Sequence, residues 1–279
     1  MKLLRVGKKN EEIVAVLDSN KKLRDVSSYI SDLNPDTISF ENLKKLQKVD
    51  LDKLTEIDSG VRIANCVSRP GDFFAVGLNY KAHAEGTNSQ LPSEPILFNK
   101  STGCLQGPND LILKPKEAKK LDYEVEVAMV IGKKAKYVKE ENAQDYIFGY
   151  CIINDISERS WQKERGGQWV KGKSIAGPCG PYLVTKDEIK DINNINLSLN
   201  VNGERRQTGN TERMIFSFDF LISHISQFMT LYPGTIIATG TPAGTAMEMS
   251  EPKFLQNGDK LDLKVDFLGE QNQLIIEQN

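Results

Sequence analysis

Short hydrophobic runs separated by polar turns dominate this chain and predict a protein built mainly from β-strands. The runs lie at residues 13–17, 73–78, 96–98, 111–113, 123–131, 147–153, 197–201, 235–239 and 260–267. Many are rich in β-branched and aromatic residues and are bounded by Gly, Pro, Asn or Asp, as is typical of strands joined by turns. Residues 216–229 differ, because their apolar side chains recur with helical spacing and Pro233-Gly234 follows. That pattern predicts one amphipathic helix.

The sequence changes character near residue 69. Before it the chain is polar, with one expected strand at residues 13–17 and one expected helix at residues 39–46. After it the buried strands and the loops rich in Gly and Pro begin. We therefore expect a small N-terminal domain over residues 1–68 and a main domain over residues 69–279. The expected fold class is mixed, α+β and rich in strands.

Composition and charge argue against several classes of partner and location for this protein. The 36 Lys and Arg residues nearly balance the 38 Asp and Glu residues, and the net charge of −2 gives no general attraction to nucleic acid or anionic lipid. The apolar runs are too short to cross a bilayer, and the N-terminus lacks the apolar core of a signal peptide. Widely spaced cysteines without a CxxC pair fit reduced thiols. We therefore expect a cytoplasmic protein without a nucleic-acid or membrane partner.

Glu124 and Glu126 lie on one face of the longest predicted strand, because side chains two residues apart in a strand point the same way. That face continues with Ala128 and Val130 and so becomes apolar. Two carboxylates where a buried face opens to water repel each other and lose hydration, and a divalent cation removes both costs. Oxygen ligands favour Mg²⁺, Mn²⁺ or Ca²⁺ over zinc. The alternative is a pair of surface carboxylates on the solvated rim of an edge strand.

Asp155 directly follows the apolar run at residues 147–153 and Asn154, so it lies at the carboxyl end of a predicted strand. Functional groups often occupy such positions, which makes Asp155 a candidate third metal ligand. The alternative is local: Asp155 and Glu158, three residues apart before a short helix, also match a capping box.

Two histidines occur in the chain, and their surroundings differ. His224 falls within the predicted amphipathic helix, where a packed structural role is favoured. His83 falls in a polar segment just after a predicted buried strand. There it is a candidate general base with a nearby carboxylate to orient it, and the alternative is a surface loop histidine.

Two further segments carry candidate binding residues. The stretch at residues 159–174 is cationic and contains the pair Gly166-Gly167, so it could bind an anionic substrate. It holds Arg159, Gln162, Gln168, Lys171 and Lys173. The alternative is a set of ordinary solvated side chains. Thr241 follows a buried strand in a Gly-rich turn that lacks the Gly-Lys-Ser/Thr ending of a phosphate-binding P-loop. Its alternative is a tight structural turn.

In their order along the chain these segments resemble the fumarylacetoacetate hydrolase family. The resemblance runs over about residues 69–268 and rests on five segments together: Gly77-Leu78-Asn79-Tyr80 with His83; Glu124-x-Glu126; Gly149-Tyr150 to Asn154-Asp155 with Glu158-Arg159; Gln168 to Ser174; and Thr239-Gly240-Thr241-Pro242. Within the family the chain looks closest to the bacterial branch of 2,4-diketo-3-deoxy-L-fuconate hydrolases and acylpyruvate hydrolases.

The resemblance implies a β-sandwich roll, usually a homodimer, whose main domain is catalytic. It implies Mg²⁺ or Mn²⁺, with Ca²⁺ conceivable in a crystal, held by Glu124, Glu126 and Asp155. It implies that His83 activates water, that Lys173 offsets developing negative charge, and that the substrate is surrounded by Arg159, Gln162, Gln168 and Thr241. The implied reaction is hydrolysis of a carbon–carbon bond in a small anionic 2,4-dioxo acid. Relatives decarboxylate, isomerise or act on ureidoglycolate-like compounds, and these remain alternatives.

Two departures from the family pattern bear on the reaction. Many relatives place a glutamate three residues after the histidine to orient it, whereas this chain has Gly86 there and Glu85 one residue earlier. Two interpretations stay open: Glu85 takes the orienting role through a shifted loop, or the orienting pair is absent. The segment after Lys173-Ser174 also lacks an acidic residue that many relatives have. A further alternative is therefore that this protein binds a metal and a ligand but catalyses no reaction.

Overall fold

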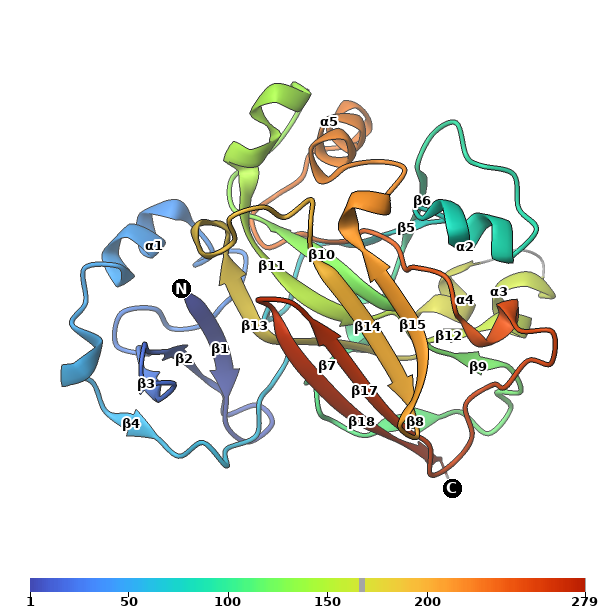
Figure 1. The fold of residues 1–279 in the computed structure, drawn as a ribbon. Helices are drawn as coiled ribbons and strands as arrows, with labels where there is room; N and C mark the ends of the chain where they lie inside the picture. The colour runs from blue at the N-terminus through green and yellow to red at the C-terminus, as the bar shows by residue number, and fades with distance from the viewer. Residues whose placement is uncertain (166–168, 279) are drawn as a thin grey trace.

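The computed structural model describes residues 1–165 and 169–278, and it confirms a β-rich fold with few helices. Each expected strand corresponds to a strand of the structure. The largest sheet has eleven strands and forms the body of the molecule (Figure 1). In spatial order it runs β4 (Glu56–Ile57), β3 (Leu23–Asp25), β2 (Ile13–Leu17), β1 (Lys2–Val6), β13 (Gly177–Thr185), β11 (Ile147–Asn154), β10 (Val125–Ile131), β16 (Ile236–Ala238), β5 (Phe73–Gly77) and β6 (Ile96–Asn99), with β7 (Leu105–Gln106) beside β13.

Residues 1–57 lie at one side of the body and extend the same sheet (Figure 1). The connection is antiparallel pairing between β1 and β13, with Leu3 opposite Leu183. Leu3 and Val14 also share a buried cluster with Val130 of β10. The N-terminal strands are therefore continuous with the main sheet, and the expected domain boundary at residues 68 and 69 stays a prediction.

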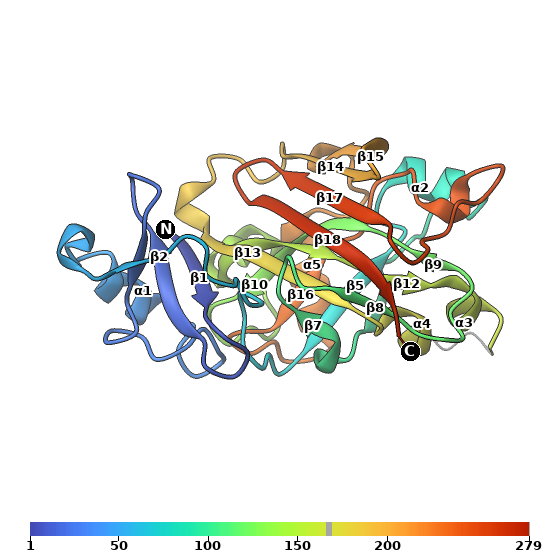
Figure 2. The ribbon, with the colours of Figure 1, turned by 90° about the horizontal axis from the view of Figure 1, so that it is seen from below.

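A second sheet packs over the first and makes the molecule a two-layered sandwich. Viewed from below, β17 and β18 run across β13 and β10 (Figure 2). In order this sheet has β15 (Glu204–Asn210), β14 (Asn196–Val201), β17 (Lys260–Val265), β18 (Gly269–Glu277) and β8 (Ile112–Lys114), and a separate pair joins β12 (Ser157–Glu158) to β9 (Leu121–Asp122). Val125, Val127 and Met129 of β10 face the core between the two sheets, whereas Ala128 and Val130 face the opposite core. The predicted alternation of β10 is confirmed.

The described residues form five α-helices around the sheets. They are α1 (Phe40–Leu46), α2 (Lys81–Gly86), α3 (Arg159–Lys163), α4 (Trp169–Lys173) and α5 (Phe218–Phe228), and six 3₁₀ turns accompany them: η1 (Leu51–Lys53), η2 (Thr102–Cys104), η3 (Glu140–Tyr146), η4 (Lys186–Glu188), η5 (Thr211–Arg213) and η6 (Ala246–Glu248). The predicted helices at residues 39–46 and 216–229 are confirmed as α1 and α5. His224 lies between Phe220 and Phe228 on α5, with ring centroids 5.7 and 5.0 Å away, so it packs against neighbouring aromatic rings as expected for a structural residue.

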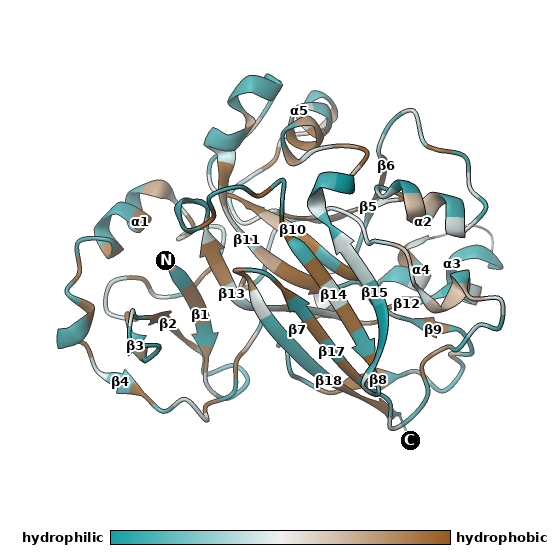
Figure 3. Ribbon diagram, viewed as in Figure 1, coloured by the Kyte–Doolittle hydropathy of each residue, from teal (hydrophilic) through white to brown (hydrophobic). Residues whose placement is uncertain are grey.

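Hydropathy follows the layers. The central strands are hydrophobic along much of their length, while many loops are hydrophilic (Figure 3). All four cysteines are buried and free. Within the described residues, no helix combines the length and apolar character that a membrane span requires.

Candidate active site

Three carboxylates at the adjoining ends of β10 and β11 converge beneath a cavity. Glu124, Glu126 and Asp155 each offer an oxygen atom, and these oxygens all lie within 4.8 Å of one another. Glu124 and Glu126 are 3% and 2% exposed, and Asp155 is fully buried. The pair at Glu124 and Glu126 is therefore not a solvated rim, and β10 is a central strand between β11 and β16.

The register of β10 and β11 brings the three carboxylates together. Val125 lies opposite Asn154, which places Glu124 next to Asp155 across the ladder. The Asp155 amide donates to the Glu124 carbonyl at 2.9 Å, and the Asn154 side chain accepts from the Glu124 amide at 3.1 Å. The capping-box interpretation of Asp155 is wrong, because Glu158 itself caps α3 and accepts from the Trp161 amide at 2.6 Å.

Two cations neutralise Glu124. Lys173 Nζ donates to Glu124 at 2.5 Å and to Asp155 at 3.1 Å, and Arg159 donates to the other Glu124 oxygen at 2.6 Å. Burial alone would raise the pKa of Glu124, but Lys173 and Arg159 outweigh burial and hold it far below its ordinary value. A third cation, Lys100, is fully buried and contacts Asp155 and the Lys173 carbonyl.

Glu126 is the least compensated member of the triad. Its only hydrogen-bond partner among the described residues is the Gly240 amide, which donates at 2.9 Å. Gly240 has φ +98°, and a Cβ there would lie 2.8 Å from the Asn79 side chain, so the approach requires glycine. Burial raises the pKa of Glu126 well above its ordinary value, and Asp155 and Glu124 add to the effect. A buried all-oxygen set with one uncompensated carboxylate fits a hard divalent cation such as Mg²⁺ or Mn²⁺.

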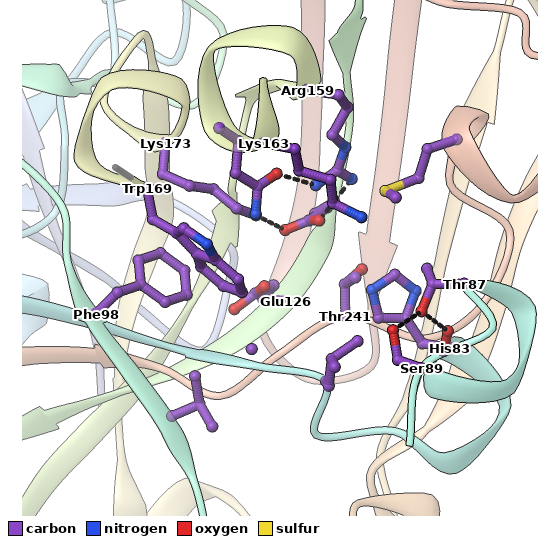
Figure 4. Close-up of a pocket in the computed structure, with 16 residues that line it drawn as sticks. His83, Thr87, Ser89, Phe98, Glu126, Arg159, Lys163, Trp169, Lys173 and Thr241 are labelled. Atoms are coloured by element: carbon purple, nitrogen blue, oxygen red, sulfur yellow. Dashed lines mark hydrogen bonds and ion pairs between the residues drawn. The ribbon is translucent and has the colours of Figure 1, made fainter. Parts of the chain in front are cut away.

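The cavity above the triad is small and mixed in character. Its volume, counted as the space open to the centres of water molecules, is about 90 Å³. That is room for a few waters or one small organic acid. The wall includes Glu124, Glu126, His83, Arg159, Gln162, Lys163, Lys173 and Thr241, together with the apolar side chains of Phe98, Trp169 and Met247 (Figure 4).

His83 lines this cavity from α2, but its carboxylate partner is not Glu85. Two residues apart on a helix point in nearly opposite directions, and the Glu85 side chain is 61% exposed, beside Lys81 at 3.8 Å. The prediction that Glu85 orients the histidine is therefore wrong. His83 Nδ1 instead contacts Glu248 of η6.

The other predicted binding residues have distinct positions. Thr241 is buried beside the cavity, where its hydroxyl donates to the Val125 carbonyl at 3.0 Å. Gln162 accepts from Arg159 at 3.2 Å and lines the same cavity. Arg159 also donates to Asp122 at 2.8 Å, so it both borders the cavity and supports the acidic cluster. Gln168 lies outside the described residues.

Three functional candidates escaped the sequence analysis. Lys100, Lys163 and Glu248 lie 55, 8 and 93 residues from Asp155 by their numbering. Lys163 directly follows Gln162 in the cationic stretch, so its neighbours were a usable signal. Lys100 and Glu248 stand in segments with no recognisable pattern, and only the tertiary fold brings them to the site.

Comparison with known proteins identifies the family. The family model described as fumarylacetoacetate (FAA) hydrolase C-terminal matches residues 72–276, and the chain belongs to the fumarylacetoacetate hydrolase family. The chain is 46% identical over 276 residues to a Burkholderia ambifaria protein that carries only the general name of a hydrolase, with 98% of each chain covered.

Solved structures of this fold include enzymes with different reactions. A fumarylacetoacetate hydrolase from Exiguobacterium antarcticum superposes with a TM-score of 0.86 at 31% identity, with both chains fully covered. A maleylpyruvate hydrolase from Sphingobium sp. SYK-6, solved with manganese(II) and pyruvate, gives 0.83 at 27%. A 5-carboxymethyl-2-hydroxymuconate delta-isomerase from Mycobacterium smegmatis gives 0.79 at 27%, and both pairs are fully covered. The fold thus serves hydrolases and isomerases.

Proposed function

We propose that this protein is a Mg²⁺- or Mn²⁺-dependent hydrolase that cleaves a carbon–carbon bond in a 2,4-dioxo acid. The observation that carries the proposal is the buried triad of Glu124, Glu126 and Asp155 beneath a cavity that His83 and Lys173 also line. The similar maleylpyruvate hydrolase, solved with manganese and pyruvate, supports both the type of metal and the type of ligand.

The triad would hold the ion, which when bound would withdraw electron density from the 2-oxo acid group of the substrate. His83 is placed to take a proton from a water molecule in the cavity, because Glu248 occupies Nδ1 and Nε2 remains for the cavity. That water would add to the distal carbonyl group. Lys173 is placed to offset negative charge that develops as the carbon–carbon bond breaks. Gln162 and Thr241, which line the cavity, would contact the bound acid.

The finer expectations on partner and location belong to the same proposal. The substrate would be a small anion, because Lys163 and Lys173 border the cavity. We propose a homodimer in the cytoplasm, and the four free thiols fit a reducing compartment.

A substrate panel tests the proposal. Protein freed of metal by a chelator and then reloaded with Mn²⁺ should hydrolyse at least one acylpyruvate to two organic acids. Glu126→Gln should reduce kcat/KM by about 100-fold or more, whereas Glu141→Gln, on the exposed surface of η3, should not change it. Equal turnover by the chelated and reloaded protein would contradict metal dependence.

Product analysis separates the alternative reactions on this scaffold. Release of CO₂ from oxaloacetate would indicate a decarboxylase, and an isomer of unchanged mass would indicate an isomerase like the Mycobacterium smegmatis relative. Turnover of ureidoglycolate would indicate the lyase alternative. Saturable binding of Mn²⁺ and oxalate with no turnover of any acid would indicate a silent binding protein.

A further inference from the structure

Three cysteines meet in the buried core that the main sheet shares with the N-terminal segment. Cys179 Sγ lies 3.5 Å from Cys66 Sγ and 3.8 Å from Cys151 Sγ, and the three sulfur atoms all lie within 4.8 Å of one another. All three side chains are fully buried. We call these three residues the thiol cluster. It is separate from the acidic triad, and the proposed function makes no use of it.

The pairing of β11 and β13 explains why two of the sulfurs are neighbours. Cys179 of β13 lies opposite Ile153, and Cys151 comes two residues before Ile153 on β11, so both cysteines are on the same face of the sheet. Cys66 joins them from the segment between β4 and β5, where its amide donates to the Cys179 carbonyl at 3.3 Å. The thiol cluster therefore draws one sulfur from each of three separate segments.

The surroundings of the thiol cluster are apolar. The same buried core contains Leu3, Leu33, Phe73, Val130 and Leu183. Within the described residues, no fourth His, Cys, Asp or Glu atom lies within the same distance of all three sulfurs. Structural zinc is almost always bound by four ligands, so a dry set of three sulfurs suits an ion that accepts three-coordinate geometry.

The spacing of the sulfurs fits an ion at their centre. A metal–sulfur bond is about 2.3 Å long, so an ion in the plane of three sulfurs needs them about 4 Å apart. The separations from Cys179, 3.5 and 3.8 Å, approach that value. Buried cysteines also occur singly as small apolar residues, and Cys104 lies in the same core without belonging to the thiol cluster.

The charge of the thiol cluster favours one class of ion. The thiols of Cys151 and Cys66, which lie against the Cys179 sulfur, hold the pKa of Cys179 well below its ordinary value despite its burial. Burial raises the pKa of Cys66, and contact with Cys179 raises that of Cys151. The cluster therefore carries one thiolate and two thiols. A monovalent cation neutralises this single charge, whereas a divalent cation would leave a net charge in the apolar core.

We propose that Cys66, Cys151 and Cys179 form a buried site for one Cu(I) ion bound by three sulfurs. Sulfur ligands favour this soft ion over the hard ions that the acidic triad would hold. The ion keeps its oxidation state on binding, so no electron is transferred. Because the site joins the segment after β4 to two strands of the main sheet, the bound ion stabilises the fold and enters before the core closes.

Loading during refolding tests the site, since the thiol cluster is closed in the folded protein. The full chain is unfolded in urea and refolded without oxygen in the presence of Cu(I), held at a defined free concentration by a competing chelator. The wild type should retain one copper per chain, and X-ray absorption should show three sulfur neighbours at about 2.3 Å. The melting temperature should rise by about 5 °C or more over that of the metal-free refolded protein.

Matched alanine variants identify the ligands. Cys66→Ala and Cys179→Ala should each lower the Cu(I) affinity by at least about tenfold and lose the rise in melting temperature. Cys104→Ala, in the same core, is the control and should match the wild type. Circular dichroism checks that each variant has refolded, and loading just below the melting temperature replaces refolding for any variant that has not.

Three outcomes would overturn the proposal. Folded wild-type protein could retain no copper by either route, copper could bind with oxygen or nitrogen neighbours only, or Cys66→Ala could bind Cu(I) as tightly as the wild type. Tighter binding of Zn²⁺ than of Cu(I) at the three sulfurs would overturn the assignment of the ion. Mn²⁺ binding at the acidic triad should be the same in all these variants, so this proposal and the proposed function can fail independently.

Discussion

Lys163 is a cation at the cavity with no ion-pair partner among the described residues. It reaches over the cavity from α3 on the side of His83 (Figure 4). Burial lowers its pKa, and the nearby cations Arg159 and Lys173 lower it further. Lys163 is therefore placed to bind a second anionic group of the substrate. The first, the 2-oxo acid group, would bind on the triad side of the cavity.

The residue-scale prediction concerns this cation. Lys163→Met keeps the length of the side chain but removes its charge. We expect KM to rise by about tenfold for a dioxo acid with a carboxylate at its far end, a change of about 1.4 kcal/mol, and to stay unchanged for one with an uncharged end. Steady-state kinetics on the two compounds provide the measurement. Lys171→Met on α4, outside the cavity wall, is the control, and an equal effect on both compounds would contradict the prediction.

At the scale of elements, α3 depends on one buried carboxylate. Glu158 accepts from the amides of Trp161, Lys119 and Lys120, at 2.6, 3.1 and 2.6 Å. It thus caps α3 and ties it to the chain before β9. Because α3 presents Arg159 and Gln162 to the cavity, the cap supports the site without touching it.

Removal of this cap should weaken both stability and the site. Glu158→Ala leaves several amide donors unpaired, and we expect a loss of about 2 kcal/mol in the free energy of unfolding, measured with urea. Glu164→Ala, at the exposed end of the same helix, should cost less than about 0.5 kcal/mol. Equal losses would contradict the capping role.

Elements differ in how far the sequence reveals them. The strands with alternating or continuous apolar residues, such as β10 and β11, were predictable, and so was the shared face of Glu124 and Glu126. β13 was not, because its Gly and Pro residues usually mark turns. The first half of β18 consists largely of Gln and Asn, so no apolar pattern marks it as a strand. Its Gln side chains are buried all the same, and they form hydrogen bonds with distant segments of the chain.

The same limit applies to the site. Asp155 was predictable because it directly follows a strand that pairs with the strand of Glu126. Glu248 was not, because no local pattern indicates that a glutamate 165 residues from His83 will lie against it. At position 86 the sequence shows only that the usual carboxylate is absent. It does not show which residue contacts His83 in its place.

At the scale of the whole molecule, three exposed aromatic side chains bear on the proposed homodimer. Phe228, Tyr232 and Tyr137 are 67%, 53% and 67% exposed. Phe228 ends α5, and the amide of Tyr137 donates to the Ser226 carbonyl at 3.0 Å, so these segments are adjacent. Large exposed apolar side chains that gather on one surface favour contact with another protein.

We therefore expect light scattering to give twice the chain mass of 31.2 kDa. Phe228→Ser should weaken the dimer, because it removes an aromatic side chain from this surface. Phe267→Ser, also exposed but at the turn between β17 and β18, is the control. A monomeric wild-type protein at micromolar concentration would contradict the expectation.

The central claim is that the buried carboxylates form a divalent-metal site, and calorimetric titration with Mn²⁺ tests it most directly. We predict one ion per chain for the wild type, for Glu85→Gln and for Glu248→Gln, whose altered residues lie outside the triad. Glu126→Gln should bind at least tenfold more weakly, because it loses the carboxylate with the fewest protein partners. No saturable binding by the wild type, or equal affinity in Glu126→Gln, would contradict the account.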